Sequence, residues 1–159
     1  MGNQNHISGN VLGQISLMQS VVAQLPDQTS MLKFVCQGFK DVSGVNNINY
    51  RLLNEDSFDN ERLLKNNLTH HFNISHKDFK YADLYFNLSD KNSFSPYIPF
   101  IENFCNMLGV IFEEQRKTKL NKSIMADLEK RILERTMELE KEIIERKQAE
   151  RKLQESEAR

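Results

Sequence analysis

The stretch YADLYFNLSDKNSFSPYIPFIENFCNMLGVIFEEQR, residues 81–116, contains the change of hydrophobic period that decides the fold. In residues 81–88, apolar side chains alternate with the others, which is typical of a half-buried β-strand. After the polar stretch 89–95, apolar residues recur every three or four positions, as on one face of an α-helix. The sequence therefore predicts a strand followed by a long amphipathic helix.

The apolar stripe of this predicted helix is broad. Its members, in chain order, are Tyr97, Ile98, Ile101, Phe104, Cys105, Leu108, Ile111 and Phe112. A stripe of this width is expected to pack against two surfaces. We expect one side to pack on the sheet and the other on a second subunit.

Two further helices are predicted upstream. Apolar residues at steps of three and four over residues 11–25 form one face of a helix that ends at Pro26. Asp27 or Ser30 can cap a second helix, and Gly44 is suited to end it. The apolar face of this second helix is expected at Leu32, Val35, Phe39 and Val42.

Two more segments show the alternation of a strand, residues 47–53 and 68–75. The short polar connection before residue 81 favours an antiparallel hairpin between the second and third strands. The order helix, helix, three strands, long helix predicts the α+β class, a small antiparallel sheet with helices gathered on one face.

Composition excludes several classes of protein. The 159 residues carry 21 Lys and Arg against 22 Asp and Glu, and this balance argues against a dedicated nucleic-acid binder. Two separate cysteines exclude a disulfide scaffold and favour a reducing compartment. Because no apolar run reaches the length of a membrane span and residues 1–10 do not resemble a signal peptide, we expect a cytoplasmic protein without membrane insertion.

Residues 113–159 differ from the rest, with 13 basic and 12 acidic residues and no aromatic residue, glycine or proline. Apolar residues there recur at spacings of 7 and 11, which predicts a parallel coiled coil with a stutter. We therefore divide the chain into a flexible N-terminus (1–10), a domain (11–115) and a coiled-coil signalling helix (116–159). The predicted dimer seam comprises Ile101, Leu108, Leu128, Ile132, Leu139, Arg146 and Leu153.

Residues 16–53 (SLMQSVVAQLPDQTSMLKFVCQGFKDVSGVNNINYRLL) resemble the first two helices and first strand of a GAF domain, and residues 81–116 resemble its last strand and closing helix. The tail LEKRILERTMELEKEIIERKQAERKLQESEAR, from residue 128, is similar to the linker that joins sensory domains in sensor histidine kinases. The resemblance implies a homodimer that continues into a downstream PAS or kinase domain of a two-component system.

The resemblance to GAF domains is incomplete. GAF domains usually place further strands and two short helices between the first strand and the last hairpin, but only residues 54–67 are available for them. A reduced GAF-like sheet with a poor or absent pocket is therefore expected. The NKFDE motif of cyclic-nucleotide-binding GAF domains has no match, so no nucleotide site is carried over.

The sequence has no recognisable catalytic motif. None of the four histidines has the context of a phosphoacceptor, and no ATP-binding motif is present, so we expect no enzymatic activity and no cofactor. The alternative is a haem or metal redox sensor, with His70 as the candidate ligand because it shares the apolar parity of its strand. Its neighbour His71 must point to the opposite face. Cys36 and Cys105 are expected to be buried, inert thiols.

Three aromatic residues, Tyr50, Tyr85 and Phe86, either line a pocket or pack within the sheet. The function that fits these patterns best is a sensory, signal-transmitting module of a sensor histidine kinase, in which a coiled coil relays a conformational change. The alternatives are a purely structural dimerisation module and the haem or metal redox sensor.

Overall fold

The computed structural model describes residues 7–53 and 68–159. The chain divides into two compact units between Glu114 and Gln115, one residue before the boundary predicted from composition. We call the first unit the domain and the second, Gln115–Arg159, the C-terminal segment. The stretch 54–67, the only one available for the further GAF elements, lies outside the described residues.

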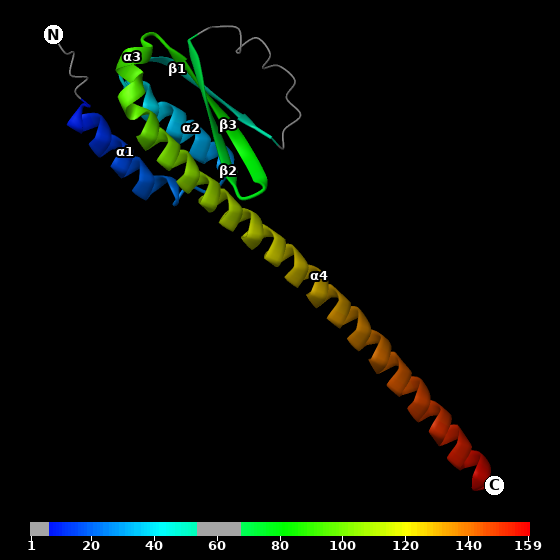
Figure 1. The fold of residues 1–159 in the computed structure, drawn as a ribbon. Helices are drawn as coiled ribbons and strands as arrows, with labels where there is room; N and C mark the ends of the chain where they lie inside the picture. Colours follow the sequence, from blue (N-terminus) through cyan, green and yellow to red (C-terminus); the bar gives the residue numbers. More distant parts are fainter. Residues whose placement is uncertain (1–6, 54–67) are drawn as a thin grey trace, which may run out of the picture. The chain divides into compact units, whose positions relative to one another are not determined.

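The domain begins with two short helices (Figure 1). Helix α1, Gly9–Val22, buries Val11, Ile15, Met18 and Val22. Helix α2, Gln28–Gly38, starts at Asp27, whose carboxylate accepts a hydrogen bond from the backbone N–H of Ser30 at 2.8 Å. Of the two capping residues that the sequence allowed, Asp27 is therefore the cap. Helix α1 also begins within the stretch 1–10 that was expected to be flexible.

Three strands form one antiparallel sheet in the order β1-β3-β2. Their bounds are Val45–Leu52 for β1, Thr69–His76 for β2 and Phe79–Leu88 for β3. The predicted hairpin between the second and third strands is confirmed. Strand β2 is shifted by one residue toward the turn relative to the expected 68–75, and β3 begins two residues earlier than expected. The turn between them includes Lys77 in the left-handed region with φ 51°.

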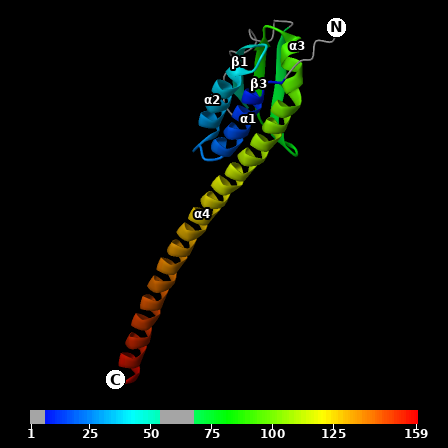
Figure 2. The ribbon, with the colours of Figure 1, turned by 90° about the vertical axis from the view of Figure 1, so that its left-hand side faces the viewer.

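Helices α1 and α2 and the N-terminal part of helix α4 lie on one face of the sheet (Figures 1 and 2). The alternation of each strand places its apolar residues on this face, and together with the helices they form one hydrophobic core. The ring of Phe39 contacts Phe86 and Phe104 at centroid distances of 5.8 and 5.2 Å, which joins the sheet to α4. The α+β class predicted from the period change is therefore confirmed.

One residue departs from the alternation. The register shifts opposite Ile74 and Ser75, so that Tyr81 is an extra residue in β3. Its ring packs on Phe112 and its hydroxyl donates a hydrogen bond to buried Glu113 of α4. Strict period two would place Tyr81 on the polar face, but the bulge turns its side chain toward the core.

The chain leaves the sheet through helix α3, Lys91–Phe94, and a 3-10 turn, Ser95–Tyr97. Helix α4 then runs as one helix over Ile98–Glu157. The amphipathic helix expected after residue 95 and the helix expected over residues 116–159 are thus one continuous helix. In the domain, a Cβ at Gly109 would come 2.1 Å from the carbonyl oxygen of Ser75, so only glycine allows α4 to approach β2 this closely.

Candidate functional site

The face of the sheet opposite the helices carries polar side chains around one carboxylate. Asp83 lies on the central strand β3, with Arg51 directly beside it on β1 and Asn73 beside it on β2. The Asp83 side chain is only 1% exposed. A buried carboxylate is costly unless charged or hydrogen-bonded partners surround it.

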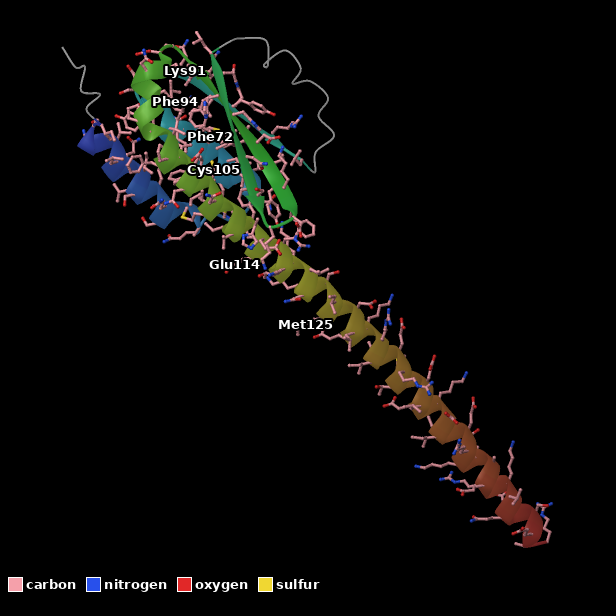
Figure 3. The ribbon with its side chains drawn as sticks, in the orientation of Figure 1. Phe72, Lys91, Phe94, Cys105, Glu114 and Met125 are labelled. Carbon is pink, nitrogen blue, oxygen red and sulfur yellow. The ribbon has the colours of Figure 1, made fainter. Side chains whose placement is uncertain are left out.

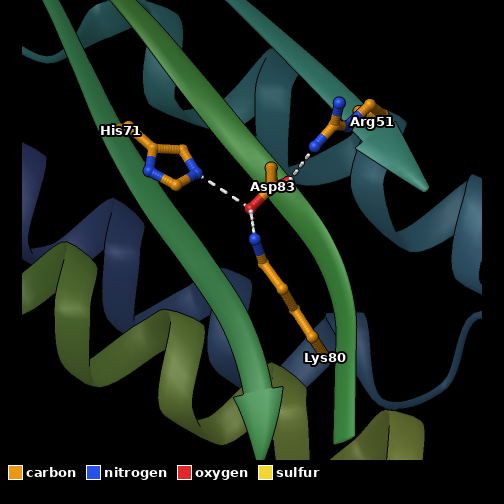
Figure 4. Close-up of polar contacts among 4 residues, drawn as sticks. All are labelled: Arg51, His71, Lys80 and Asp83. Atoms are coloured by element: carbon orange, nitrogen blue, oxygen red, sulfur yellow. Dashed lines mark hydrogen bonds and ion pairs between the residues drawn. The ribbon is translucent and has the colours of Figure 1, made fainter. Parts of the chain in front are cut away.

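Three basic side chains supply those partners (Figure 4). Arg51 Nη2 lies 2.9 Å from Asp83 Oδ2, while Lys80 Nζ at 2.9 Å and His71 Nε2 at 2.8 Å both meet Oδ1. The three basic side chains are each about 40% exposed, at 37%, 41% and 44%. We call these four residues the Asp83 cluster.

The bulge at Tyr81 also builds the Asp83 cluster. Residues 80 and 83 are an odd number apart, so a regular strand would place them on opposite faces. The extra residue between them restores a common face, and Lys80 pairs with Asp83. Arg51, Lys80 and Asp83 were not among the site residues predicted from the sequence. The available signal was an acidic residue within the mainly aromatic and aliphatic strand YADLYFNL.

The electrostatics of the cluster favour the ionised carboxylate. Burial alone would raise the pKa of Asp83, but hydrogen bonds from Lys80, His71 and Arg51 outweigh it and hold the pKa below its usual value. With one negative charge against Arg51 and Lys80, the cluster carries a formal charge of +1 when His71 is neutral. The cluster therefore stabilises the sheet at neutral pH and leaves an excess positive charge on this face.

The candidate haem ligand His70 lies on the core face, as its parity predicted. It is level with Phe86 of β3, and its ring contacts Phe72 and Phe94 at 4.7 and 5.7 Å. Figure 3 shows Phe72, Phe94 and Lys91 in this part of the domain. Burial lowers the pKa of His70, with a further contribution from Lys91. A neutral imidazole could ligate a metal, but among the described residues no three His, Cys, Asp or Glu side chains are grouped to hold one.

The other histidine of the pair faces the opposite way, as expected. His71 stacks on Tyr85 at 5.0 Å with an interplanar angle of 23°. Tyr85 therefore belongs to the polar face, whereas Tyr50 and Phe86 pack toward the core. The three aromatic residues considered as a pocket lining do not share a face, and packing within the sheet is their role.

Both cysteines are buried free thiols. Burial raises the pKa of Cys36 and that of Cys105 to about 12. The thiolate is the reactive form of cysteine, so these thiols are poorly suited to redox sensing. Figure 3 shows Cys105 on α4 within the domain.

Two residues of the predicted seam are placed elsewhere. Ile101 and Leu108 are fully buried in the hydrophobic core of the domain. They are therefore unavailable to a partner, and their assignment to a dimer seam was wrong. The cause is the breadth of the apolar stripe, because the residues one position earlier on α4 are also apolar and periodicity alone does not separate the two rows.

The remaining seam residues lie in the C-terminal segment, where every residue after Arg116 is exposed. Figure 3 shows the side chains of this segment, Met125 among them, pointing outward along the helix. Arg146 pairs with Glu142 at 2.9 Å and Arg131 with Asp127 at 3.0 Å, both one helical turn apart. The exposed apolar seam residues are Leu128, Ile132, Leu139 and Leu153.

Comparisons with known proteins give no assignment. No family model matches the chain, and no curated protein or solved structure is significantly similar to it. The resemblance to GAF domains and to histidine-kinase linkers therefore stays a prediction. Within the described residues, no helix has both the length and the apolar character needed to cross a membrane.

Proposed function

We propose that this chain is a homodimeric sensory and signal-transmitting module of a sensor histidine kinase, and that its C-terminal segment forms a parallel coiled coil. One observation carries the proposal. Ile132, Leu139 and Leu153 are exposed on the C-terminal segment, and they lie on one row with a spacing of seven residues or multiples of seven. Such a row on a highly charged helix is typical of a coiled-coil seam.

The physical reason for a partner is the exposed apolar surface. Ile132 and Leu139 are 59% and 43% exposed in a single copy. Covering such side chains removes apolar area from water and is favourable in proportion to that area. Ion pairs such as Lys130–Glu134 and Arg146–Glu142 support the helix, but they leave the apolar row uncovered.

Signal relay would follow from the marginal register of this row. Arg146 occupies the position between Leu139 and Leu153, where an apolar residue would complete the seam. Leu128 to Leu139 and Ile132 to Ile143 are instead spaced by 11, which favours a different local supercoil. A change in the domain would then shift the balance between two helix registers, and the output domain would respond to that shift.

The dimer is tested by a double substitution, Ile132→Asp with Leu139→Asp. We expect monomers in sedimentation velocity experiments, because two buried carboxylates per helix would face each other across the seam. The matched control is Leu133→Asp with Ile144→Asp, which changes residues of similar exposure, 61% and 57%, on another side of the helix. A double variant that stays dimeric, or a control that dissociates equally, would contradict the seam.

The relay is tested by fusing residues 1–159 to the catalytic core of a histidine kinase and inserting one to seven residues after Arg159. A rotary or register signal predicts that autophosphorylation rises and falls with the phase of the helix, returning near its starting value at seven residues. A dimeric fusion whose activity is independent of phase would instead identify a purely structural dimerisation module.

A further inference from the structure

The domain's part of α4 carries a second apolar row beside the buried one. Phe100 and Val110 are 38% and 43% exposed, and Met107 is partly buried at the edge of the core. Ile101 and Leu108, one position further along the chain, are fully buried. One position on a helix is a rotation of about 100°, so these are separate rows, and the described residues of the domain cover only one of them.

The uncovered row has the geometry of a seam. Phe100 and Met107 are seven residues apart and therefore lie almost directly above one another. Asn103 and Val110 lie three residues after each of them and complete the alternating steps of three and four. These four positions include no charged residue, in contrast to the exposed surface of the C-terminal segment.

We propose that this row, Phe100, Asn103, Met107 and Val110, is a contact surface for a second copy of this chain. The choice of occupant rests on the proposed function and on spacing along the sequence. Leu128 follows Met107 by 21 residues and Phe100 by 28, which are three and four complete heptads. Phe100 and Met107 therefore share the heptad position of Leu128, one of the seam residues proposed to pair with a second copy in the C-terminal segment.

Polar residues interrupt the same positions between these two apolar stretches. Glu114 and Asn121 occupy the heptad positions between Met107 and Leu128. In a parallel dimer, Glu114 would face the same carboxylate of the second copy, and like charges at a seam are unfavourable. We infer two contact zones separated by a weak polar layer, so the zone in the domain can open while the other stays paired.

The surface is tested by oxidative cross-linking of single-cysteine substitutions in the full chain. Met107→Cys probes the proposed surface, Glu102→Cys is an exposed control on another side of α4, and Ile132→Cys probes the C-terminal segment. The unsubstituted chain is the background control, because Cys36 and Cys105 are buried. We expect disulfide-linked dimers from Met107→Cys and Ile132→Cys but not from Glu102→Cys.

Each other result has a separate meaning. Cross-linking of Ile132→Cys without Met107→Cys would overturn the inference and leave the proposed dimer intact. Cross-linking of Met107→Cys alone would support the surface while contradicting the seam of the C-terminal segment. Equal cross-linking of Glu102→Cys would overturn the inference as non-specific collision, and absence of any product would overturn both proposals.

A second variant guards against a local effect of the new thiol. Phe100→Glu should raise the dimer dissociation constant at least about tenfold in sedimentation equilibrium, because a charge would replace a side chain at the contact. Leu133→Glu, which is off both rows, should leave the dissociation constant unchanged. Near-UV circular dichroism of the tyrosines, all of which lie in the domain, reports whether each variant keeps its fold. An unchanged dissociation constant for folded Phe100→Glu would overturn the inference.

Discussion

Helix α4 contains two parts with opposite environments. In the domain its apolar residues pack among aromatic side chains of the sheet, whereas in the C-terminal segment residues with similar spacing are exposed. Both parts show helical periodicity, and both belong to the same helix, Ile98–Glu157. Periodicity therefore predicts where a helix forms. Whether the apolar face of that helix is covered depends on the residues on its other sides.

The largest expected difference between the two parts comes from one substitution made in each. Leu108 is fully buried and Leu133 is 61% exposed. Leu108→Ala should lower the free energy of unfolding by about 2–5 kcal/mol, because it removes core contacts and leaves a cavity. Leu133→Ala should change it by less than about 0.5 kcal/mol. Urea unfolding followed by tyrosine fluorescence measures the domain, since all four tyrosines lie there.

If the two leucine variants lost similar amounts of unfolding free energy, the contrast between the two parts of α4 would be contradicted, because Leu133 would then be buried in solution. Such a result would also require a revised seam, since Leu133 is off the proposed row. Sedimentation of both variants at the concentrations used for unfolding separates a loss of core packing from a loss of association.

A second test concerns the closest approach between α4 and the sheet. Gly109→Ala places a methyl group against the backbone carbonyl of Ser75, which cannot move as a side chain could. We expect a loss of about 1–3 kcal/mol in the free energy of unfolding from this overpacking. The control is Gly13→Ala on α1, where nothing lies within 4 Å of the added Cβ and helix propensity favours alanine. A neutral Gly109→Ala would contradict the close contact between α4 and β2.

The third test compares the Asp83 cluster with the exposed ion pairs of the C-terminal segment. Asp83→Asn removes the charge that Arg51, Lys80 and His71 share, and it should cost about 1–3 kcal/mol, below the usual loss for a buried pair because the basic partners are partly exposed. The lowered pKa of Asp83 in the folded protein gives the pH dependence. Its contribution is present above the unfolded pKa of about 4 and is lost as pH falls through the folded pKa.

The measurement is the difference in unfolding free energy between the unsubstituted chain and Asp83→Asn, taken from pH 7 down to pH 3. The difference should be constant near neutrality and shrink below about pH 4. A difference that grows as pH falls would contradict the assignment of the ionised carboxylate.

Most of the fold could be predicted because burial repeats with the period of each element. The three strands, the hairpin and helices α1, α2 and α4 follow from that repetition. Helix α3 lies in the stretch expected to be a polar connection, and α2 ends at Gly38 rather than continuing to Gly44. Tyr81 could not be predicted, because a bulge depends on the pairing of two strands rather than on the sequence of one. The same bulge is the reason that the Asp83 cluster was not predicted. Lys80 and Asp83 share a face of the sheet only because Tyr81 is an extra residue between them.

The prediction of individual surface residues failed for a related reason. Phe100 and Ile101 are both large and apolar, and so are Met107 and Leu108. The sequence alone therefore allows either row to face the core, and the wrong row was assigned to the seam. His70 and His71 were placed correctly because strand parity separates neighbours by half a turn, whereas neighbours on a helix differ by only about 100°.

The smallest expected effect concerns Arg146, which is 79% exposed and paired with Glu142 in a single copy. Arg146→Leu removes an ion pair worth about 0.3–0.5 kcal/mol, so an isolated helix should lose stability slightly. In the proposed dimer, the new leucine fills the gap between Leu139 and Leu153, and burial should outweigh that loss by about 1 kcal/mol per helix pair. The sign of the change in melting temperature of the helical signal, measured by far-UV circular dichroism, therefore distinguishes the two states. A lower melting temperature would show that Arg146 is not at a seam and would favour the 11-residue spacing through Ile143.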